Sequence, residues 1–169
     1  HRGASEEHRE NTMAALIAAD KNSKYAFIEF DVQFSKDSRI VVFHDKRMLR
    51  LYGSLGTIGS QTFAELYKIT DGEITAYDEV IGRLKKKLNI EIKEARPSTI
   101  QSLCRLIRDH QMTSNVVVAS FGTDSLKEFR RLCPQVATSA GASEARLFFG
   151  LQKAYLEAAY SPVVQVLQV

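Results

Sequence analysis

The chain has 169 residues, enough to bury one sizeable core, and a single domain spanning 1–169 is the default expectation. Its composition, 44% hydrophobic and 25% charged, excludes a disordered chain or a long coiled coil. The net charge of +3 is small and evenly spread, and no apolar run approaches the roughly 18 residues that a membrane span needs. We therefore expect no nucleic-acid partner and no transmembrane segment.

The first twelve residues, HRGASEEHRENT, are crowded with titratable side chains and contain no apolar run. The chain starts on His1 rather than on Met, so we expect a trimmed N-terminus. No signal peptide is visible, which leaves the compartment undetermined with a slight preference for the cytoplasm. The oligomeric state is equally undetermined.

Short β-branched runs then alternate with amphipathic segments. The runs predict strands over Tyr25–Val32, Arg39–Phe43, Leu88–Lys93, Asn115–Ser120, Val136–Ser139 and Val163–Val169. Helices are predicted over Thr12–Asp20 behind an Asn11 cap, Tyr77–Lys87, Thr99–Gln111, Asp124–Leu132 and Ser143–Glu157. This alternation indicates an α/β protein with a parallel sheet, either doubly wound or closed into a barrel.

Three segments need separate interpretation. Residues 46–75 have weak periodicity and recurring glycines, so we expect an extended excursion, of the kind that is often functional. The basic run Arg83–Lys87 is expected at the solvated end of a helix, with a phosphate or membrane patch as the alternative. Cys104 and Cys133 lie far apart with no zinc-like spacing, and we expect buried free thiols.

Carboxylates interrupt two of the predicted strands. Glu29 and Asp31 lie two residues apart, on one face of an otherwise apolar strand. Two buried carboxylates repel unless a cation compensates them, and a divalent metal with oxygen ligands does so. Glu91 on a later strand would complete the ligand set, and Lys93 would offer a charge to an anion. The alternative for that later strand is a half-exposed surface strand.

Two histidines accompany these carboxylates. His44-Asp45 directly follows a predicted strand, where barrel enzymes carry catalytic groups, although a lone histidine there is commonly just exposed. His1 opens the chain beside Arg2 and Gly3. Two imidazoles can divide acid and base roles near neutral pH, and an arginine can bind phosphate oxygens.

The succession HRG (1–3), ENT (10–12), IEFDV (28–32), VVFHD (41–45) and NIEIK (89–93), with Ser120-Phe121 later, resembles the glycerophosphodiester phosphodiesterases. That family folds as a (β/α)8 TIM barrel with its active site at the C-terminal ends of the strands. The resemblance covers essentially the whole chain and is densest over residues 1–93. It implies a hydrolase of glycerolipid metabolism that cleaves a small phosphodiester into an alcohol and glycerol phosphate.

The resemblance also assigns roles to residues. It implies that His1 and His44 are the catalytic acid/base pair, and that Glu29, Asp31 and Glu91 bind one divalent cation, Mg²⁺ or Ca²⁺. Arg2 and Lys93 would hold the phosphate. Glu10, Asp45 and Phe121 would support the site, with Phe121 lining its mouth. Residues 46–75 would form a small cap suited to a small head group such as glycerol.

The chain departs from the family pattern in two respects. Arg9 stands where the family commonly has Pro, and the segments expected for the first strand and the last one or two units of a complete barrel are absent. We therefore expect an incomplete barrel with six of eight strands. Two alternatives remain: a related barrel phospholipase, similar to sphingomyelinase D or phosphatidylinositol-specific phospholipase C, and a non-catalytic barrel that binds phosphate or metal.

Overall fold

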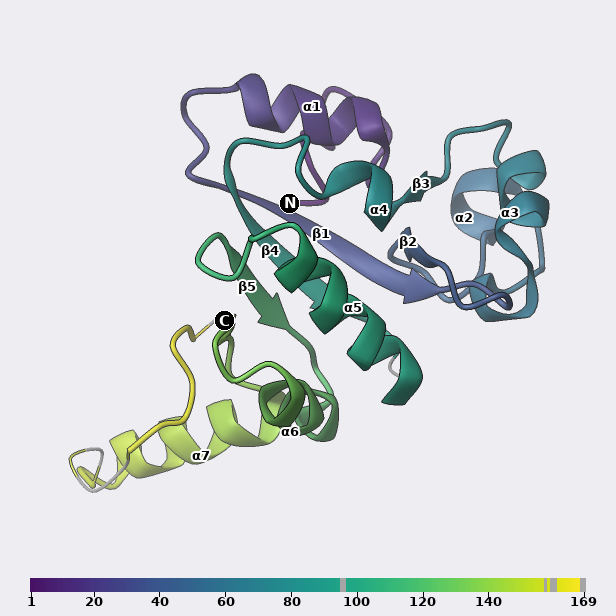
Figure 1. Cartoon of the computed structure of the whole chain (residues 1–169). Coiled ribbons are helices and arrows are strands. Elements are labelled where there is room, and N and C mark those ends of the chain that lie inside the picture. The colour runs from purple at the N-terminus through teal and green to yellow at the C-terminus, as the bar shows by residue number, and fades with distance from the viewer. Residues whose placement is uncertain (95–96, 157, 159–160, 168–169) are drawn as a thin grey trace.

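The computed structural model describes residues 1–94, 97–156, 158 and 161–167. Within this part of the chain the strands form one six-stranded sheet in the order β3-β2-β1-β4-β5-β6. Figure 1 labels the first five strands of this order, from β3 to β5. The strands are β1 (Phe27–Phe34), β2 (Ile40–Val42), β3 (Thr75–Ala76), β4 (Lys87–Ile92), β5 (Val116–Ala119) and β6 (Ala137–Thr138). The pairs β1-β4, β4-β5 and β5-β6 run parallel, as the alternating pattern predicts.

Helices connect and cover these strands. They are α1 (Met13–Lys21), α2 (Leu49–Tyr52), α3 (Phe63–Ile69), α4 (Tyr77–Val80), α5 (Pro97–Asp109), α6 (Thr123–Leu132) and α7 (Ala142–Lys153), with a short 3-10 helix η1 (Ile58–Ser60). Leu16 of α1, Leu103 of α5 and Phe129 of α6 pack in one core with Phe30 of β1 and Ile90 of β4. The fold is α/β, with the parallel strands and outer helices of an incomplete (β/α)8 barrel.

The strand predicted over Arg39–Phe43 exists as β2, but it runs antiparallel to β1, so the expectation of a parallel sheet is wrong at this edge. The reason is the short connection between the two strands. A parallel pair needs a crossover of a dozen or more residues, whereas an antiparallel hairpin closes with a few. Ser35 stabilises this turn through its hydroxyl, which donates to the Arg39 carbonyl at 3.1 Å.

Thr12, not the predicted Asn11, caps the first helix. The Thr12 hydroxyl accepts a hydrogen bond from Ala15 N–H at 3.3 Å. Asn11 has a φ of +58° and is buried, and its side chain turns toward β1 instead. Both residues are good caps, so the sequence pattern alone does not distinguish them.

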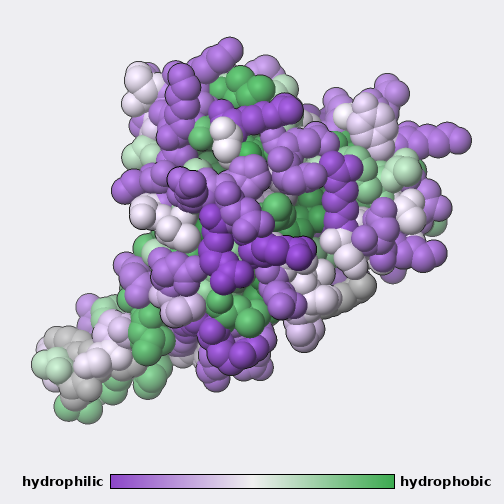
Figure 2. Space-filling view, in the orientation of Figure 1, coloured by the Kyte–Doolittle hydropathy of each residue, from purple (hydrophilic) through white to green (hydrophobic). Residues whose placement is uncertain are grey.

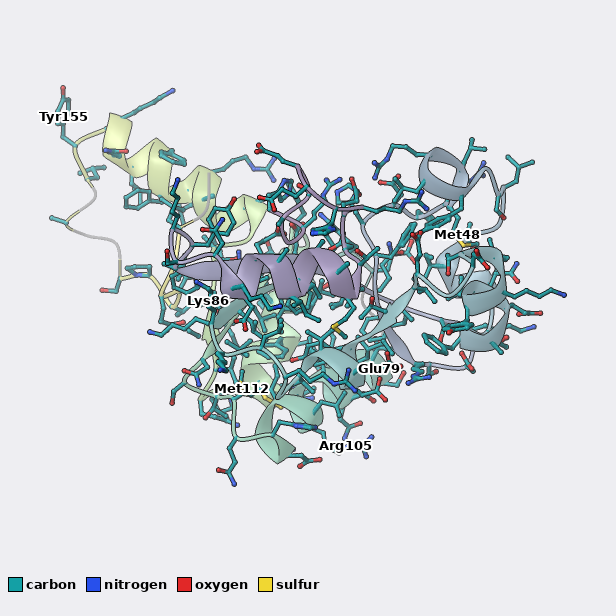
Figure 3. The ribbon with its side chains drawn as sticks, turned by 90° about the horizontal axis from the view of Figure 1, so that it is seen from above. Met48, Glu79, Lys86, Arg105, Met112 and Tyr155 are labelled. Atoms are coloured by element: carbon teal, nitrogen blue, oxygen red, sulfur yellow. A yellow bond between two sulfur atoms is a disulfide. The ribbon has the colours of Figure 1, made fainter. Side chains whose placement is uncertain are left out.

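The helix predicted over Tyr77–Lys87 ends at Val80, which corrects the placement of the basic run. The run lies in the connection between α4 and β4, with Lys87 as the first residue of β4, and not at a helix end. The Asp20 carboxylate accepts from the backbone N–H groups of Lys85 and Lys86 at 2.9 and 3.0 Å. Lys86 Nζ donates to the carbonyls of Asn22 and Tyr25, just beyond the end of α1 (Figure 3). These contacts tie the run to the protein.

The two cysteines form a disulfide, so the prediction of free thiols is wrong. Cys104 lies on α5 and Cys133 directly after α6, with their Cα atoms 5.8 Å apart. The two helices pack together, which brings residues 29 positions apart in sequence into range. Nothing in the local sequence around either cysteine indicates this pairing.

Residues 46–75 are more ordered than an extended excursion, because they contain α2, η1 and α3. They form a second small core in which Met48, Ile58 and Leu66 are fully buried. Met48 lies on the opposite side of the molecule from Tyr155 (Figure 3). The segment leaves β2 and returns at β3, where Val42 and Thr75 are paired. It is therefore inserted at one edge of the sheet.

The C-terminal part of the described chain is more exposed than the sheet, and α7 has no buried residue. The strand predicted over Val163–Val169 is represented by one parallel bridge, Ser139 to Val166; residues 168 and 169 of that prediction, like Glu157 of the α7 prediction, lie outside the described residues. Apolar atoms are exposed along the arm that carries α7 (Figure 2), where Leu147 and Phe149 face solvent. Among the described residues no helix combines the length and apolar character needed to cross a membrane.

Candidate functional site

Three carboxylates meet on the parallel strands β1 and β4. In the register of this pair Asp31 lies beside Glu91, and Glu29 lies beside Asn89. Because side chains two residues apart share a face, Glu29, Asp31 and Glu91 project from the same side of the sheet. One oxygen from each lies within 4.8 Å of the others. The structure thus brings the three predicted metal-ligating residues together.

Two cations offset this negative charge. Lys93 Nζ lies 2.7 Å from Glu91 Oε1 and 3.0 Å from Asp31 Oδ1, and Arg2 Nε lies 3.6 Å from Asp31 Oδ2. Burial favours the neutral amine of Lys93, but the hydrogen bond that Nζ donates to Glu91 and the ion pair with Asp31 outweigh it and raise the pKa of Lys93. Burial raises the pKa of Glu29 by penalising its charged form.

The first residues of the chain fold against these carboxylates. The backbone N–H of Arg2 donates to Glu29 Oε2 at 2.7 Å, and Gly3 N–H donates to the Glu29 carbonyl at 3.0 Å. Gly3 has a φ of +74°, and a Cβ there would lie 2.7 Å from the Ala15 carbonyl carbon. Only glycine fits this conformation and this close approach. The Asn11 amide completes the loop by donating to Asp31 Oδ2 at 2.8 Å.

His44 is oriented by its neighbour. His44 Nδ1 lies 2.6 Å from Asp45 Oδ1. The hydrogen bond from Arg50 lowers the pKa of Asp45 to about 2, so Asp45 is ionised at neutral pH and only accepts hydrogen bonds. A neutral His44 therefore carries its proton on Nδ1 and presents the lone pair of Nε2.

A buried glutamine fixes the backbone of the same segment. Gln33 Nε2 lies 3.0, 2.9 and 2.8 Å from the carbonyl oxygens of Phe43, His44 and Asp45. Gln33 is the third member of the alternating face that carries Glu29 and Asp31. It holds the chain after β2 in a curve around its amide group.

Glu10 and Arg50 connect the two sides of the site. Glu10 accepts hydrogen bonds from Arg2 Nη1 at 3.0 Å and from Arg50 Nη2 at 2.6 Å. Arg50 Nε also donates to Asp45 Oδ2 at 2.7 Å. The hydrogen bond from Arg50 lowers the pKa of Glu10. Glu10 and Asp45, predicted as supporting residues, are thus joined by an arginine of the 46–75 segment.

A cavity of about 370 Å³ opens beside the carboxylates. Glu29, Glu91, His1, Ser120 and Phe121 are among its lining residues. The His1 side chain is 69% exposed, with Nε2 3.8 Å from Glu29 Oε2, and Phe121 is 78% exposed. Within the described residues no hydrogen bond or ion pair joins the imidazoles of His1 and His44. His1 lines this cavity, whereas His44, Arg2 and Lys93 are not among its lining residues.

The side chains present fit a hard divalent cation. Carboxylate oxygens are the ligands that Mg²⁺ and Ca²⁺ prefer, and three of them converge here. Asn89 Oδ1, beside Glu29 on the cavity wall, is buried and has no hydrogen-bond partner among the described residues. An unpartnered buried oxygen is costly unless a ligand or a water satisfies it. An acidic group able to hold a metal is therefore present.

Sequence reasoning missed three residues of this site. The sequence pattern could have indicated Gln33, because Gln33 continues the polar face of Glu29 and Asp31. For Asn11 the pattern is misleading, because a helix cap explains this residue equally well. No sequence pattern indicates Arg50, because it lies in a segment without periodicity and acts on residues 5 and 40 positions away.

The fold and the site define an α/β-barrel protein with a carboxylate cluster, flanked by basic side chains, on its parallel strands β1 and β4. The model of the glycerophosphoryl diester phosphodiesterase family matches residues 1–156, and the chain belongs to that family. This confirms the family that the motifs indicate.

Individual relatives agree with this assignment. YhdW of Bacillus subtilis (strain 168) is 33% identical over 153 residues, which cover 82% of this chain and 63% of that protein. A glycerophosphodiester phosphodiesterase of Caldanaerobacter subterraneus subsp. tengcongensis is 30% identical over 152 residues, 80% of this chain and 62% of its own. The chain thus spans less than two thirds of the length of these relatives.

Solved structures share the fold. The crystal structure of a glycerophosphodiester phosphodiesterase from Thermotoga maritima superposes with a TM-score of 0.73 at 27% identity, covering 90% of this chain and 67% of that one. A phosphodiesterase from Oleispira antarctica gives a TM-score of 0.77 at 23% identity, covering 100% of this chain and 82% of that one.

Proposed function

We propose that the protein hydrolyses glycerophosphodiesters to an alcohol and glycerol phosphate in a reaction that needs one divalent cation, Mg²⁺ or Ca²⁺. The observation that carries the proposal is the meeting of Glu29, Asp31 and Glu91 with Arg2 and Lys93 in a chain of this family. Three carboxylates suit the cation, and two basic groups suit an anionic phosphodiester.

His44 is proposed as the general base. It presents Nε2 as a lone pair, and the ionised Asp45 stabilises the imidazolium that forms when His44 takes a proton. A substrate hydroxyl next to the phosphate, once deprotonated, attacks phosphorus. The P–O bond to the head-group alcohol then breaks, and His1 protonates the leaving oxygen. Water opens the resulting cyclic phosphate with the two proton transfers reversed.

The remaining residues bind and position the substrate. Arg2 and Lys93 hold the phosphate oxygens and balance the charge that develops on them. The cation, when bound by Glu29, Asp31 and Glu91, supplies Lewis-acid stabilisation of that charge. Phe121 lines the mouth of the cavity, and residues 46–75 act as a small cap that suits a small head group. One domain carries all these groups.

Metal removal and two histidine variants test this function in the purified full-length protein. We expect EDTA to abolish hydrolysis of glycerophosphocholine and added Mg²⁺ or Ca²⁺ to restore it. His1→Ala and His44→Ala should each abolish turnover while Mg²⁺ binding, measured by calorimetry, is retained, because neither imidazole is among the proposed ligands. Normal turnover in either variant contradicts the assignment.

The same assay separates the alternatives. A phospholipase of this fold hydrolyses lipid micelles faster than glycerophosphocholine, which is the reverse of our expectation. A non-catalytic binding protein takes up Mg²⁺ but hydrolyses no phosphodiester in a panel of glycerophosphodiesters tested with Mg²⁺, Mn²⁺ and Ca²⁺ in turn.

A further inference from the structure

Arg50 lies outside the motifs that define the site, yet its guanidinium contacts two of the site's carboxylates. Nε donates to Asp45 Oδ2 at 2.7 Å, while Nη1 and Nη2 donate to the two oxygens of Glu10 at 3.0 and 2.6 Å. All three nitrogens of the guanidinium are therefore engaged. A planar guanidinium presents its donors in a fixed fork, so these contacts set the relative position of the two carboxylates.

Each of these carboxylates holds a group of the proposed chemistry. Asp45 accepts from His44 Nδ1 at 2.6 Å, and Glu10 accepts from Arg2 Nη1 at 3.0 Å. An unbroken chain of contacts thus runs from His44 through Asp45, Arg50 and Glu10 to Arg2. No other described side chain forms a hydrogen bond or ion pair with both Asp45 and Glu10.

We propose that Arg50 is a positioning residue that holds the general base His44 and the phosphate-binding Arg2 in a fixed relation. The inference rests on the proposed function and adds to it a residue supplied by the 46–75 segment. Arg50 acts through Asp45 and Glu10 and need not touch the substrate. Its loss should therefore slow the chemical step more than it weakens substrate binding.

Arg9 provides a matched control for a purely structural role. It also ties the N-terminal loop to the 46–75 segment, through an ion pair with Glu73 and by lying 5.0 Å from the centre of the Tyr52 ring. In the described part of the chain the Arg9 guanidinium forms no hydrogen bond or ion pair with Asp45 or with Glu10. If Arg50 only attached the segment to the barrel, Arg9→Ala and Arg50→Ala would have similar effects.

The experiment compares Arg50→Ala, Arg50→Lys and Arg9→Ala in the purified full-length protein, with glycerophosphocholine as substrate. We expect Arg50→Ala to lower kcat roughly tenfold to a hundredfold, as the loss of such supporting contacts commonly does, with little change in KM. Arg50→Lys should recover only part of the rate, because one ammonium group cannot form the fork. Arg9→Ala should keep the normal kcat.

Chemical rescue provides a second arm. The Arg50 side chain is 46% exposed, so free guanidinium at non-denaturing concentration can reach the gap left in Arg50→Ala. We expect it to raise the kcat of that variant and to leave the wild type and Arg9→Ala unchanged. Equal loss of kcat in Arg50→Ala and Arg9→Ala, or a normal kcat in Arg50→Ala, overturns the proposal.

A spectroscopic arm keeps this inference separate from the proposed function. The ¹⁵N resonances of the His44 imidazole report its hydrogen bond to Asp45, whether or not the protein turns over substrate. They should shift in Arg50→Ala and remain in place in Arg9→Ala. If the wild type hydrolyses no glycerophosphodiester, the proposed function fails, and unshifted resonances in Arg50→Ala refute the positioning role independently. A folded Arg50→Lys variant supplies the same comparison should Arg50→Ala not fold.

Discussion

Gln33 is a single buried amide that contacts three successive backbone carbonyls, those of Phe43, His44 and Asp45. A donor that serves several buried acceptors is costly to remove, because each acceptor then loses its compensation for desolvation. We expect Gln33→Leu to lower the free energy of unfolding by about 1–3 kcal/mol and to lower kcat as well. Urea denaturation and steady-state kinetics measure the two effects.

An exposed glutamine serves as the control for this change. Gln152, near the end of α7, is exposed, and Gln152→Leu should alter neither quantity. If Gln33→Leu unfolds at the same urea concentration as the wild type, Gln33 does not hold the segment around His44.

At the scale of single residues, the sequence pattern identified the proposed metal ligands but missed the side chains that position the site through tertiary contacts. Glu29, Asp31 and Glu91 stand out because a carboxylate within an apolar strand is conspicuous. The contacts of Arg50 depend on how a segment without periodicity folds back on the barrel, which no local pattern encodes. Side chains that act through tertiary contacts leave little trace in the sequence.

Among the secondary-structure elements, the disulfide between α5 and the end of α6 allows a quantitative prediction. Cross-linking residues 29 positions apart removes conformational entropy from the unfolded chain. We expect Cys104→Ala combined with Cys133→Ala to lower the free energy of unfolding by about 2–4 kcal/mol, measured by urea denaturation.

The disulfide prediction has an internal control. Adding a reductant to the wild type should lower its free energy of unfolding by a similar amount. The free energy of unfolding of the double variant should not change when the reductant is added. A wild type whose unfolding is unaffected by the reductant would show that the bond contributes nothing to stability.

Element prediction worked where one hydrophobic periodicity extended over the whole element. The β-branched runs of β1, β4 and β5 and the amphipathic helices α5 and α6 are found within a few residues of their predicted places. It failed where a short connection changed the outcome. Five residues after β1 allow only a hairpin, which reverses β2, and the turn after Val80 ends α4 early. Whether a strand runs parallel or antiparallel to its neighbour depends on the length of the connecting loop. The apolar pattern within the strand gives no information about that length.

For the whole molecule, the charge network predicts how stability depends on pH. Hydrogen bonds from Arg50 lower the pKa of Asp45 to about 2 and also lower that of Glu10, and a hydrogen bond from Arg130 lowers the pKa of Glu144. In the unfolded chain these groups return to ordinary values of 3.8 for Asp and 4.5 for Glu. Unfolding in acid therefore takes up protons.

The stabilisation from these carboxylates should be fully present above about pH 5 and be lost as the pH falls toward about 2. Urea denaturation at a series of pH values measures this loss. In Arg50→Ala the decline should be shallower, because two of the three shifts originate from that residue. A free energy of unfolding that stays constant from pH 5 to pH 2 contradicts the prediction.

The pairing of Val42 with Thr75 has an evolutionary consequence. The segment between them departs from the sheet and rejoins it at adjacent positions, and it buries Met48, Ile58 and Leu66 in a second core together with Val41 of β2 and Phe43. Insertions and deletions within this segment leave the spacing of the barrel strands unchanged. The segment can therefore vary in length among relatives without disturbing the barrel. The Arg50 contacts limit that freedom. A protein whose inserted segment lacks an arginine at this position retains the barrel fold but loses the link between Asp45 and Glu10.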